Sequence, residues 1–128
     1  PNNYEAFYNL SCAQYYQGDF EQALQSCQHA LLIDPNQAKT HINYSMTLLT
    51  MGRFSEGWKE SEWRWKDVAF ESKHKRNFPQ PLWDGSSLTG KTILIWLEQG
   101  VGDQIMFASL LPKLQQQARQ VIVETGKP

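Results

Sequence analysis

The chain has 128 residues and a formal net charge of −1, because 12 lysines and arginines are balanced by 13 aspartates and glutamates. This balance lacks the basic excess that is typical of proteins that bind nucleic acid or anionic membranes. No apolar run approaches the roughly 18 residues that a membrane-spanning helix needs, so we expect no membrane span. The length allows one domain or two small ones. Because the chain begins with Pro1 rather than Met, we expect it to be a piece of a longer protein.

Similar residues recur 34 positions apart in the first half of the chain, large on large and small on small. The clearest pairs are Phe7 with His41, Ser11 with Ser45, Gly18 with Gly52, and Phe20 with Phe54. A fixed period of this length is typical of arrays of antiparallel helix pairs. Each unit is therefore expected to contain a helix, a turn at its glycine and a second helix. In the first unit, Pro35 ends that second helix.

The residues that carry this period also carry a family resemblance. They are Phe7, Leu10, Ser11, Gly18, Asp19, Phe20, Ala23, Ala30 and Pro35. The pattern resembles the tetratricopeptide repeat family, which implies an α-α superhelix in a mainly α-helical fold. We expect a repeat region over residues 1–70, with one full repeat at 4–37 and an atypical one at 38–70. The second repeat is atypical because Gly57 replaces the usual Ala and Arg64 stands where a small residue is expected.

The resemblance also implies a binding groove. In this family the first helix of each repeat lines a concave groove that binds a protein or peptide. Here that groove would consist of Tyr8, Asn9, Cys12, Tyr15, Tyr16, Ile42, Asn43, Met46 and Leu49. Asn9 and Asn43 resemble two rungs of the asparagine ladder with which repeat-linked O-linked N-acetylglucosamine transferases hold extended polypeptide. The alternative is that both are consensus residues of the repeat. Tyr8 and Cys12 replace the Lys and Asn of chaperone-tail-binding repeats, so we expect no capture of a terminal carboxylate.

The cysteines and histidines show no spacing typical of a metal site. The only two cysteines are Cys12 and Cys27, too far apart in sequence for a short zinc motif. We therefore expect no metal and no cofactor, and two buried thiols in the reducing cytoplasm. The three histidines, His29, His41 and His74, are expected to be structural or solvated. The basic run at residues 73–76 is typical of a solvated loop, with a binding patch as the alternative.

Residues 54–70 hold three of the five tryptophans. On one continuous helix, Trp58, Glu62 and Trp65 would share a face, and Trp63 would project from another. Indoles on two faces predict burial on both sides, or a helix that caps the end of the repeat array. The prolines and glycine that follow exclude a regular helix, so we expect an ordered linker at residues 71–91.

The last part of the chain has a different pattern, which we expect to begin an α/β domain over residues 92–128. The apolar run Thr92–Leu97 predicts a strand covered on both faces, as in parallel sheets. A helix at about 104–117 and a strand at 121–123 would complete a Rossmann-like β-α-β unit with parallel strands. Pro112 either kinks that helix or opens a new turn.

The turn after the first of these strands contains Gly100 and Gly102, where dinucleotide-binding folds hold a pyrophosphate. Ile105 occupies the place of a third glycine, so the fingerprint is incomplete. Asp103 is interpreted either as the N-cap of the helix or as a functional carboxylate. In either case its charge disfavours a phosphate at the same helix terminus.

A second resemblance rests on the residues around this turn. They are Pro81-x-Trp83-x-Gly85-x-x-Leu88-x-Gly90-Lys91, Glu98-Gln99-Gly100-x-Gly102-Asp103 and Leu111-Pro112. Over residues 54–124 the chain resembles bacterial repeat proteins with a glycosyltransferase-like domain, similar to the heptosyltransferases of the GT-B class. The resemblance implies an acceptor loop formed by Glu98, Gln99, Gly100 and Gly102, with Asp103 as catalytic base for an acceptor hydroxyl.

GT-B enzymes hold the nucleotide sugar mainly in a C-terminal domain, so we expect this chain alone not to be an enzyme. A nucleotide sugar would then bind only in the parent protein. The function that we predict is a peptide-binding repeat module of a protein that acts in glycosyl transfer. The alternative is a scaffold or self-assembly module with a non-catalytic glycosyltransferase-like segment. An uncovered strand and open repeat ends predict self-association.

Overall fold

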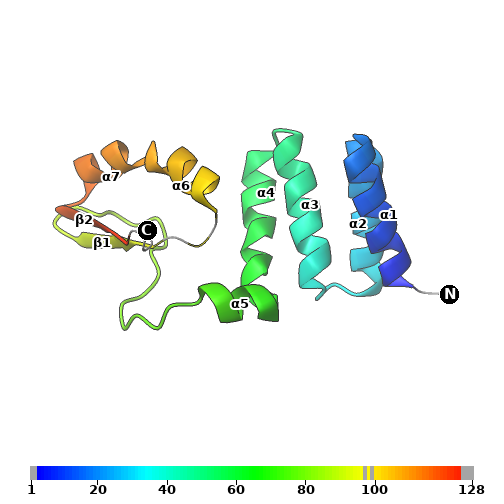
Figure 1. The fold of residues 1–128 in the computed structure, drawn as a ribbon, viewed down its shortest axis with the longest axis horizontal. Coiled ribbons are helices and arrows are strands. Elements are labelled where there is room, and N and C mark those ends of the chain that lie inside the picture. Colours follow the sequence, from blue (N-terminus) through cyan, green and yellow to red (C-terminus); the bar gives the residue numbers. More distant parts are fainter. Residues whose placement is uncertain (1–2, 97, 99, 125–128) are drawn as a thin grey trace. The chain divides into compact units, whose positions relative to one another are not determined.

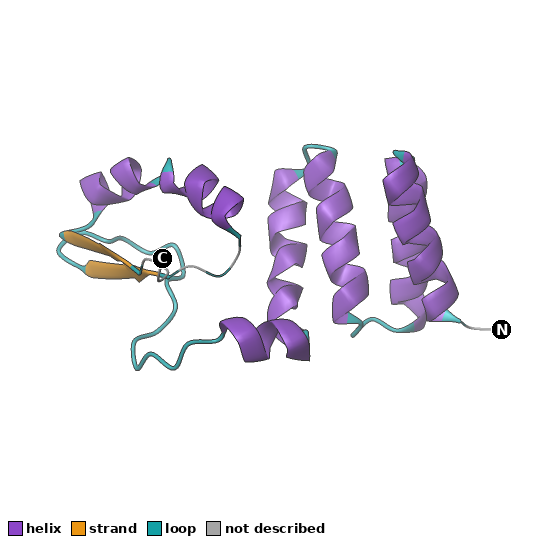
Figure 2. Ribbon diagram, viewed as in Figure 1, coloured by secondary structure: helices purple, strands orange, loops and turns teal. Residues whose placement is uncertain are grey.

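The computed structural model describes residues 3–96, 98 and 100–124. The chain divides between Lys75 and Arg76 into two compact units, each described by itself below. The described chain is mainly helical, and its two strands lie in the second unit (Figures 1 and 2). The first unit is therefore the helical unit, and the second is the β-α-β unit.

The helical unit begins with the helix pair α1 (Tyr4–Gln17) and α2 (Phe20–Ile33). Asn3 caps α1 by accepting a hydrogen bond from the Ala6 amide at 3.3 Å. Gly18 ends the same helix with a φ of 88°, a left-handed conformation that glycine adopts without strain. Small side chains let the two helices approach closely, and these are fully buried: Ser11, Ala23, Cys27 and Ala30.

The second helix pair consists of α3 (Ala38–Thr50) and α4 (Phe54–Ser61), and α3 packs against both α2 and α4. The predicted turn at Gly52 is confirmed, with a φ of 77°. The structure also explains why glycine replaces alanine at position 57. A Cβ atom there would lie 2.7 Å from Cγ and Cδ2 of Leu49, which occupies the space of the missing side chain.

Residues 54–70 do not form the one continuous helix on which Trp58, Glu62 and Trp65 would share a face. α4 ends at Ser61, and the chain continues as the 3-10 helix η1 (Glu62–Lys66) and the short helix α5 (Val68–His74). Just after the end of α4, the Arg64 guanidinium donates a hydrogen bond to the Ser61 carbonyl oxygen at 3.0 Å. Asp67 then starts α5 by accepting a hydrogen bond from the Phe70 amide. The linker predicted from residue 71 begins after this helix.

The aromatic side chains of this segment close one side of the helical unit. The indole of Trp63 stacks on the imidazole of His41 in α3, with ring centroids 3.7 Å apart and planes 5° apart. Lys66 Nζ lies 3.5 Å from the Trp63 ring centroid, at a distance that allows a cation–π interaction. Trp65 meets Phe70 edge to face at 5.3 Å. The segment therefore packs against α3 through Trp63.

The β-α-β unit contains two parallel strands and the helices between them. Its elements are β1 (Thr92–Ile95), α6 (Val101–Ala108), α7 (Leu111–Gln117) and β2 (Gln120–Val123). The strands pair in register from Thr92 with Gln120 to Ile95 with Val123. The predicted order and the parallel pairing are confirmed. β1 ends at Ile95, and Leu97, which was expected in the strand, lies outside the described residues.

Two predictions for this unit need correction. The single helix expected at 104–117 is two helices, because Pro112 lies in the first turn of α7, where a missing amide proton costs no intrahelical bond. Asp103 is not the N-cap of α6. Gly100 holds that position without a side-chain cap, and the helix already includes Val101, so Asp103 is its third residue.

Candidate functional site

The predicted groove residues all lie on α1 and α3, the first helices of the two pairs. Their exposure differs. Asn9, Tyr16 and Met46 are exposed, Asn43 is buried, and the remaining five are half-buried: Tyr8, Cys12, Tyr15, Ile42 and Leu49. We call the accessible part, without Asn43, the α1–α3 face. Tyr16 and Met46 expose 85% and 45% of their surfaces, so apolar atoms are available to a ligand on both helices.

A residue that the sequence reasoning missed joins the two helices of this face. Thr50 Oγ1 lies 3.2 Å from the hydroxyl oxygen of Tyr15, within hydrogen-bond distance. Thr50 also donates to the Met46 carbonyl oxygen at 2.9 Å, which holds its side chain on α3. The period contained the signal, because Thr50 follows Tyr16 by 34 residues.

The α1–α3 face is uncharged at neutral pH. Burial raises the pKa of the Tyr8 phenol, and its hydrogen bond with the Cys12 thiol raises this pKa further. None of the predicted groove residues is an acid or a base of the Lys, Arg, Asp or Glu type. The face therefore favours apolar and aromatic side chains of a ligand over charged ones.

Asn43 has a packing role. Its amide donates a hydrogen bond to Ser11 Oγ at 2.7 Å and approaches Cys27 Sγ at 3.6 Å. Ser11 in turn donates to the Tyr8 carbonyl oxygen at 2.7 Å. Asn43 thus links α3 to both helices of the first pair, which agrees with the consensus-residue alternative. Its amide is not presented to a ligand as a ladder rung, whereas Asn9 is exposed.

Burial also determines the chemistry of Cys27. Burial raises the pKa of this thiol, although hydrogen bonds with Ser11 and Asn43 act in the opposite direction. Because only the thiolate is a strong nucleophile or metal ligand, Cys27 is an inert core residue. Within the described residues, no group of three or more His, Cys, Asp or Glu side chains could hold a metal ion.

His41 belongs to the core of the helical unit. It is buried, its Nδ1 lies 2.5 Å from Glu60 Oε2, and its Nε2 lies 2.9 Å from the Pro35 carbonyl oxygen. With the Trp63 stack, these contacts tie α3 to α4, to η1 and to the turn before α3. The imidazole is thus structural.

The second candidate site lies where the chain leaves β1 and enters α6. Glu98, Gly100 and Gly102 precede or flank Asp103 there, and Gln99 lies outside the described residues. Asp103 is half-buried, and a Cβ atom built on Gly100 would lie 3.9 Å from its Oδ2 atom. The carboxylate therefore turns back toward the start of α6.

No helix in the described part of the chain has the length and apolar character needed to cross a membrane.

Comparisons with known proteins identify one part of the chain. The family model of the tetratricopeptide repeat matches residues 4–37, so α1 and α2 form such a repeat. Over 117 residues the chain is 32% identical to Protein FlbA of Caulobacter vibrioides, a match that covers 89% of this chain and 20% of that protein. The chain thus spans about a fifth of the length of this relative. The predicted glycosyltransferase resemblance remains a prediction.

Proposed function

We propose that the helical unit binds an extended, uncharged segment of another protein along the α1–α3 face. Tetratricopeptide repeats typically bind protein partners, and α1 and α2 belong to such a repeat. The observation that carries the proposal is the exposure of Met46 and Tyr16 on neighbouring first helices that the Tyr15–Thr50 contact joins. Apolar atoms kept exposed on two adjacent helices indicate a surface that a partner covers.

The side chains of this face suit a peptide in two ways. Methionine is flexible and polarisable, so Met46 can adapt to different apolar side chains. Asn9 can donate to and accept from a peptide backbone through its exposed amide, and the tyrosine hydroxyls can do the same. Met46 would thus provide apolar contacts, while the Asn9 amide and the tyrosine hydroxyls would hydrogen-bond to the peptide backbone and fix its direction.

A phage-displayed peptide library selected against the whole chain tests the proposal. We expect the enriched peptides to be poor in charge, and Met46→Glu to weaken their binding at least about tenfold, because a carboxylate would then have to be desolvated. Leu32→Glu is the control, since Leu32 is also apolar and exposed, at 81% against 45% for Met46, but lies on α2. Peptides whose affinity falls equally in both variants, or in neither, would refute the assignment of the face.

A second function that we propose is sugar transfer by a longer protein of which this chain would be one part, and the position of Asp103 favours it. In open sheets of parallel strands, ligands bind beyond the carboxyl ends of the strands. Asp103 lies there, between β1 and β2 in the chain and in the first turn of α6. We propose that its carboxylate accepts the proton of an acceptor hydroxyl while a sugar is transferred to that oxygen.

Transfer of a radiolabelled sugar by the longer protein tests this role. Asp103→Asn keeps the shape of the side chain but removes its basicity, so we expect at least a hundredfold loss of transfer, the order typical of a general base. Asp84→Asn is the control, because asparagine can keep the turn that Asp84 forms with the Ser86 amide. Equal transfer by both variants would reject Asp103 as the base. Peptide binding without transfer in the unaltered protein would favour the scaffold alternative.

A further inference from the structure

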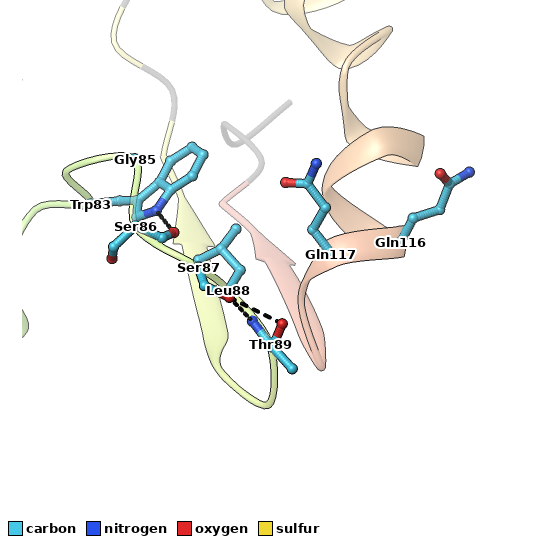
Figure 3. A pocket seen from close by; sticks show the side chains of 8 residues that line it. All are labelled: Trp83, Gly85, Ser86, Ser87, Leu88, Thr89, Gln116 and Gln117. Carbon is cyan, nitrogen blue, oxygen red and sulfur yellow. Dashed lines mark hydrogen bonds between the residues drawn. The ribbon is translucent and has the colours of Figure 1, made fainter.

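The β-α-β unit contains a polar depression that neither proposed function uses. Its volume is about 350 Å³, near the lower end of the range of about 300–1,000 Å³ for small-molecule sites. The lining residues are Trp83, Gly85, Ser86, Ser87, Leu88, Thr89, Gln116 and Gln117 (Figure 3). They come from the loop before β1 and from the end of α7, so the depression lies beside the amino ends of the strands. Asp103 follows the opposite, carboxyl end of β1.

The loop that forms one wall is held in a defined conformation. The Trp83 indole donates to the Ser86 carbonyl oxygen at 2.8 Å, and the Ser86 amide donates to Asp84 Oδ1 at 2.9 Å. Hydrogen bonds from the backbone and side chain of Ser86 lower the pKa of the Asp84 carboxyl. Gly85 has a φ of 88°, which lets the loop reverse between Trp83 and Ser86. These contacts fix the plane of the indole before any ligand arrives.

The rest of the loop is anchored to the sheet. Leu88 is buried, and its carbonyl oxygen accepts from the Lys91 amide at 2.9 Å. The Lys91 carbonyl oxygen accepts from the Arg119 amide at 2.9 Å, which ties the loop to the chain between α7 and β2. The loop before β1 and the chain that follows α7 are therefore held together by this backbone hydrogen bond. A site built this way loses little conformational entropy when a ligand binds.

The chemistry of the lining selects the ligand. Trp83 is 47% exposed and offers an aromatic face, whose negative charge density attracts weakly positive C–H groups. Trp83 and Gln117 lie on opposite sides of the depression, whereas Gln116 points away from the indole (Figure 3). No hydrogen bond within the described residues uses the Gln117 amide, so it can both donate and accept. Ser87 and Thr89 add hydroxyl groups, which hydrogen-bond to each other at 3.0 Å.

The same lining argues against other ligands. None of its side chains is charged, so an anionic group such as a phosphate would find no cation there. A proline-rich peptide is normally bound in a groove lined by several aromatic rings, and this lining has a single one. A ligand with an apolar face and many hydroxyl groups fits both the indole and the surrounding amide and hydroxyls.

We propose that this depression is a binding site for a neutral sugar residue, which stacks on Trp83 and hydrogen-bonds through its hydroxyls to Gln117, Ser87 and Thr89. The sugar is recognised there and not transformed, because the lining contains no carboxylate, imidazole, amine or thiol that could act as an acid or base or activate its serine and threonine hydroxyls. The site does not depend on sugar transfer at Asp103, and it could hold a free sugar or one attached to a larger molecule.

Nuclear magnetic resonance of the ¹⁵N-labelled chain tests the proposal. The probes are the methyl glycosides of glucose, galactose, N-acetylglucosamine and rhamnose, with glycerol as a polyol that lacks a ring. We expect at least one glycoside to shift the Trp83 indole N–H and Gln117 side-chain amide signals in a saturable way. Glycerol should shift neither.

Variants separate recognition from unspecific contact. Trp83→Ala should abolish the saturable shift of Gln117, and Gln117→Ala should weaken binding about fivefold, as expected for one lost hydrogen bond. Gln115→Ala is the matched control, because Gln115 is exposed on α7 but does not line the depression. The proposal is overturned if no glycoside gives a saturable shift, if glycerol shifts the same signals, or if a proline-rich peptide binds there and the sugars do not.

Discussion

The two units of the chain bury their apolar residues to different extents. In the helical unit Ala23, Cys27, Ala30 and Leu48 are completely buried. In the described part of the β-α-β unit, Leu88 is the single buried hydrophobic residue, and it still exposes 5% of its surface. A helix pair completes its core with its sequence neighbours, because each repeat contacts only the next one. A β-α-β unit needs further strands and helices over its sheet before its core is complete.

Helix α6 shows the consequence for one element. It carries apolar residues in the pattern of a buried helix, yet Ile105 exposes 71% of its surface, and Val101 and Met106 are exposed as well. The sequence alone thus determines the spacing of the apolar residues in α6. Whether they are buried depends on which elements pack against that helix. The comparison predicts that side-chain changes have large effects in the helical unit and small ones at the open surface of the β-α-β unit.

The largest expected effect is that of Leu48→Ala. Leu48 is completely buried, so its truncation leaves a cavity and should lower the free energy of unfolding by about 2–5 kcal/mol. Leu32→Ala, at an exposed position of the same unit, should change it by less than about 0.5 kcal/mol. Urea unfolding followed by circular dichroism measures both. Similar losses in the two variants would show that Leu48 is not in a tightly packed core.

A smaller effect is expected from adding one methyl group to each of two helical glycines. Gly57→Ala should destabilise the helical unit by about 1 kcal/mol, because the clash with Leu49 at 2.7 Å outweighs the better helix propensity of alanine. Gly102→Ala should be neutral or stabilise α6 by up to about 1 kcal/mol, since its Cβ would meet nothing within 4 Å. Thermal unfolding compares the two. A stabilising Gly57→Ala would mean that Leu49 moves freely.

The smallest expected effect concerns pH. Because burial raises the pKa of Cys27 above its ordinary 9.0, the folded state holds this proton more tightly than the unfolded state. The resulting stability is fully present below pH 9 and is lost as the pH rises through the higher folded pKa. As the pH rises above about 9, Cys27→Ala should therefore lose less stability than the unaltered chain, and Leu32→Ala should lose as much. Identical slopes in all three proteins would argue against burial of this thiol.

The parts of the fold that follow local rules could be predicted from the sequence. The 34-residue period located the turns, because Gly18 and Gly52 both adopt the left-handed backbone that the turn requires. The parallel strand pairing followed from the apolar run before the Gly100 turn. The break of α4 after Ser61 could not be predicted from local patterns, and neither could the stack of Trp63 on His41, which lies more than 20 residues away in the sequence.

In the candidate site, too, some features could be predicted from the sequence and others depend on contacts between distant residues. The period placed the groove residues on α1 and α3, but it could not distinguish Asn9 from Asn43. The two asparagines occupy equivalent repeat positions, and only Asn43 has Ser11 and Cys27 beside its amide. The polar depression could not be predicted from the sequence, because its two walls are separated by more than 25 residues and only one of them lies in a motif that the sequence singles out. Trp83 belongs to the motif that resembles the glycosyltransferase-like proteins, but that resemblance implied no binding role for its side chain.

Native-state hydrogen exchange of the whole chain tests the contrast between the units most directly. We expect the amide protons of α3, which packs on α2, α4 and η1, to exchange only through unfolding of the helical unit. Those of α6, whose apolar side chains are exposed, should exchange much faster through local opening. Equal protection of α6 and α3 would contradict the account, because the open surface of α6 would then have to be covered.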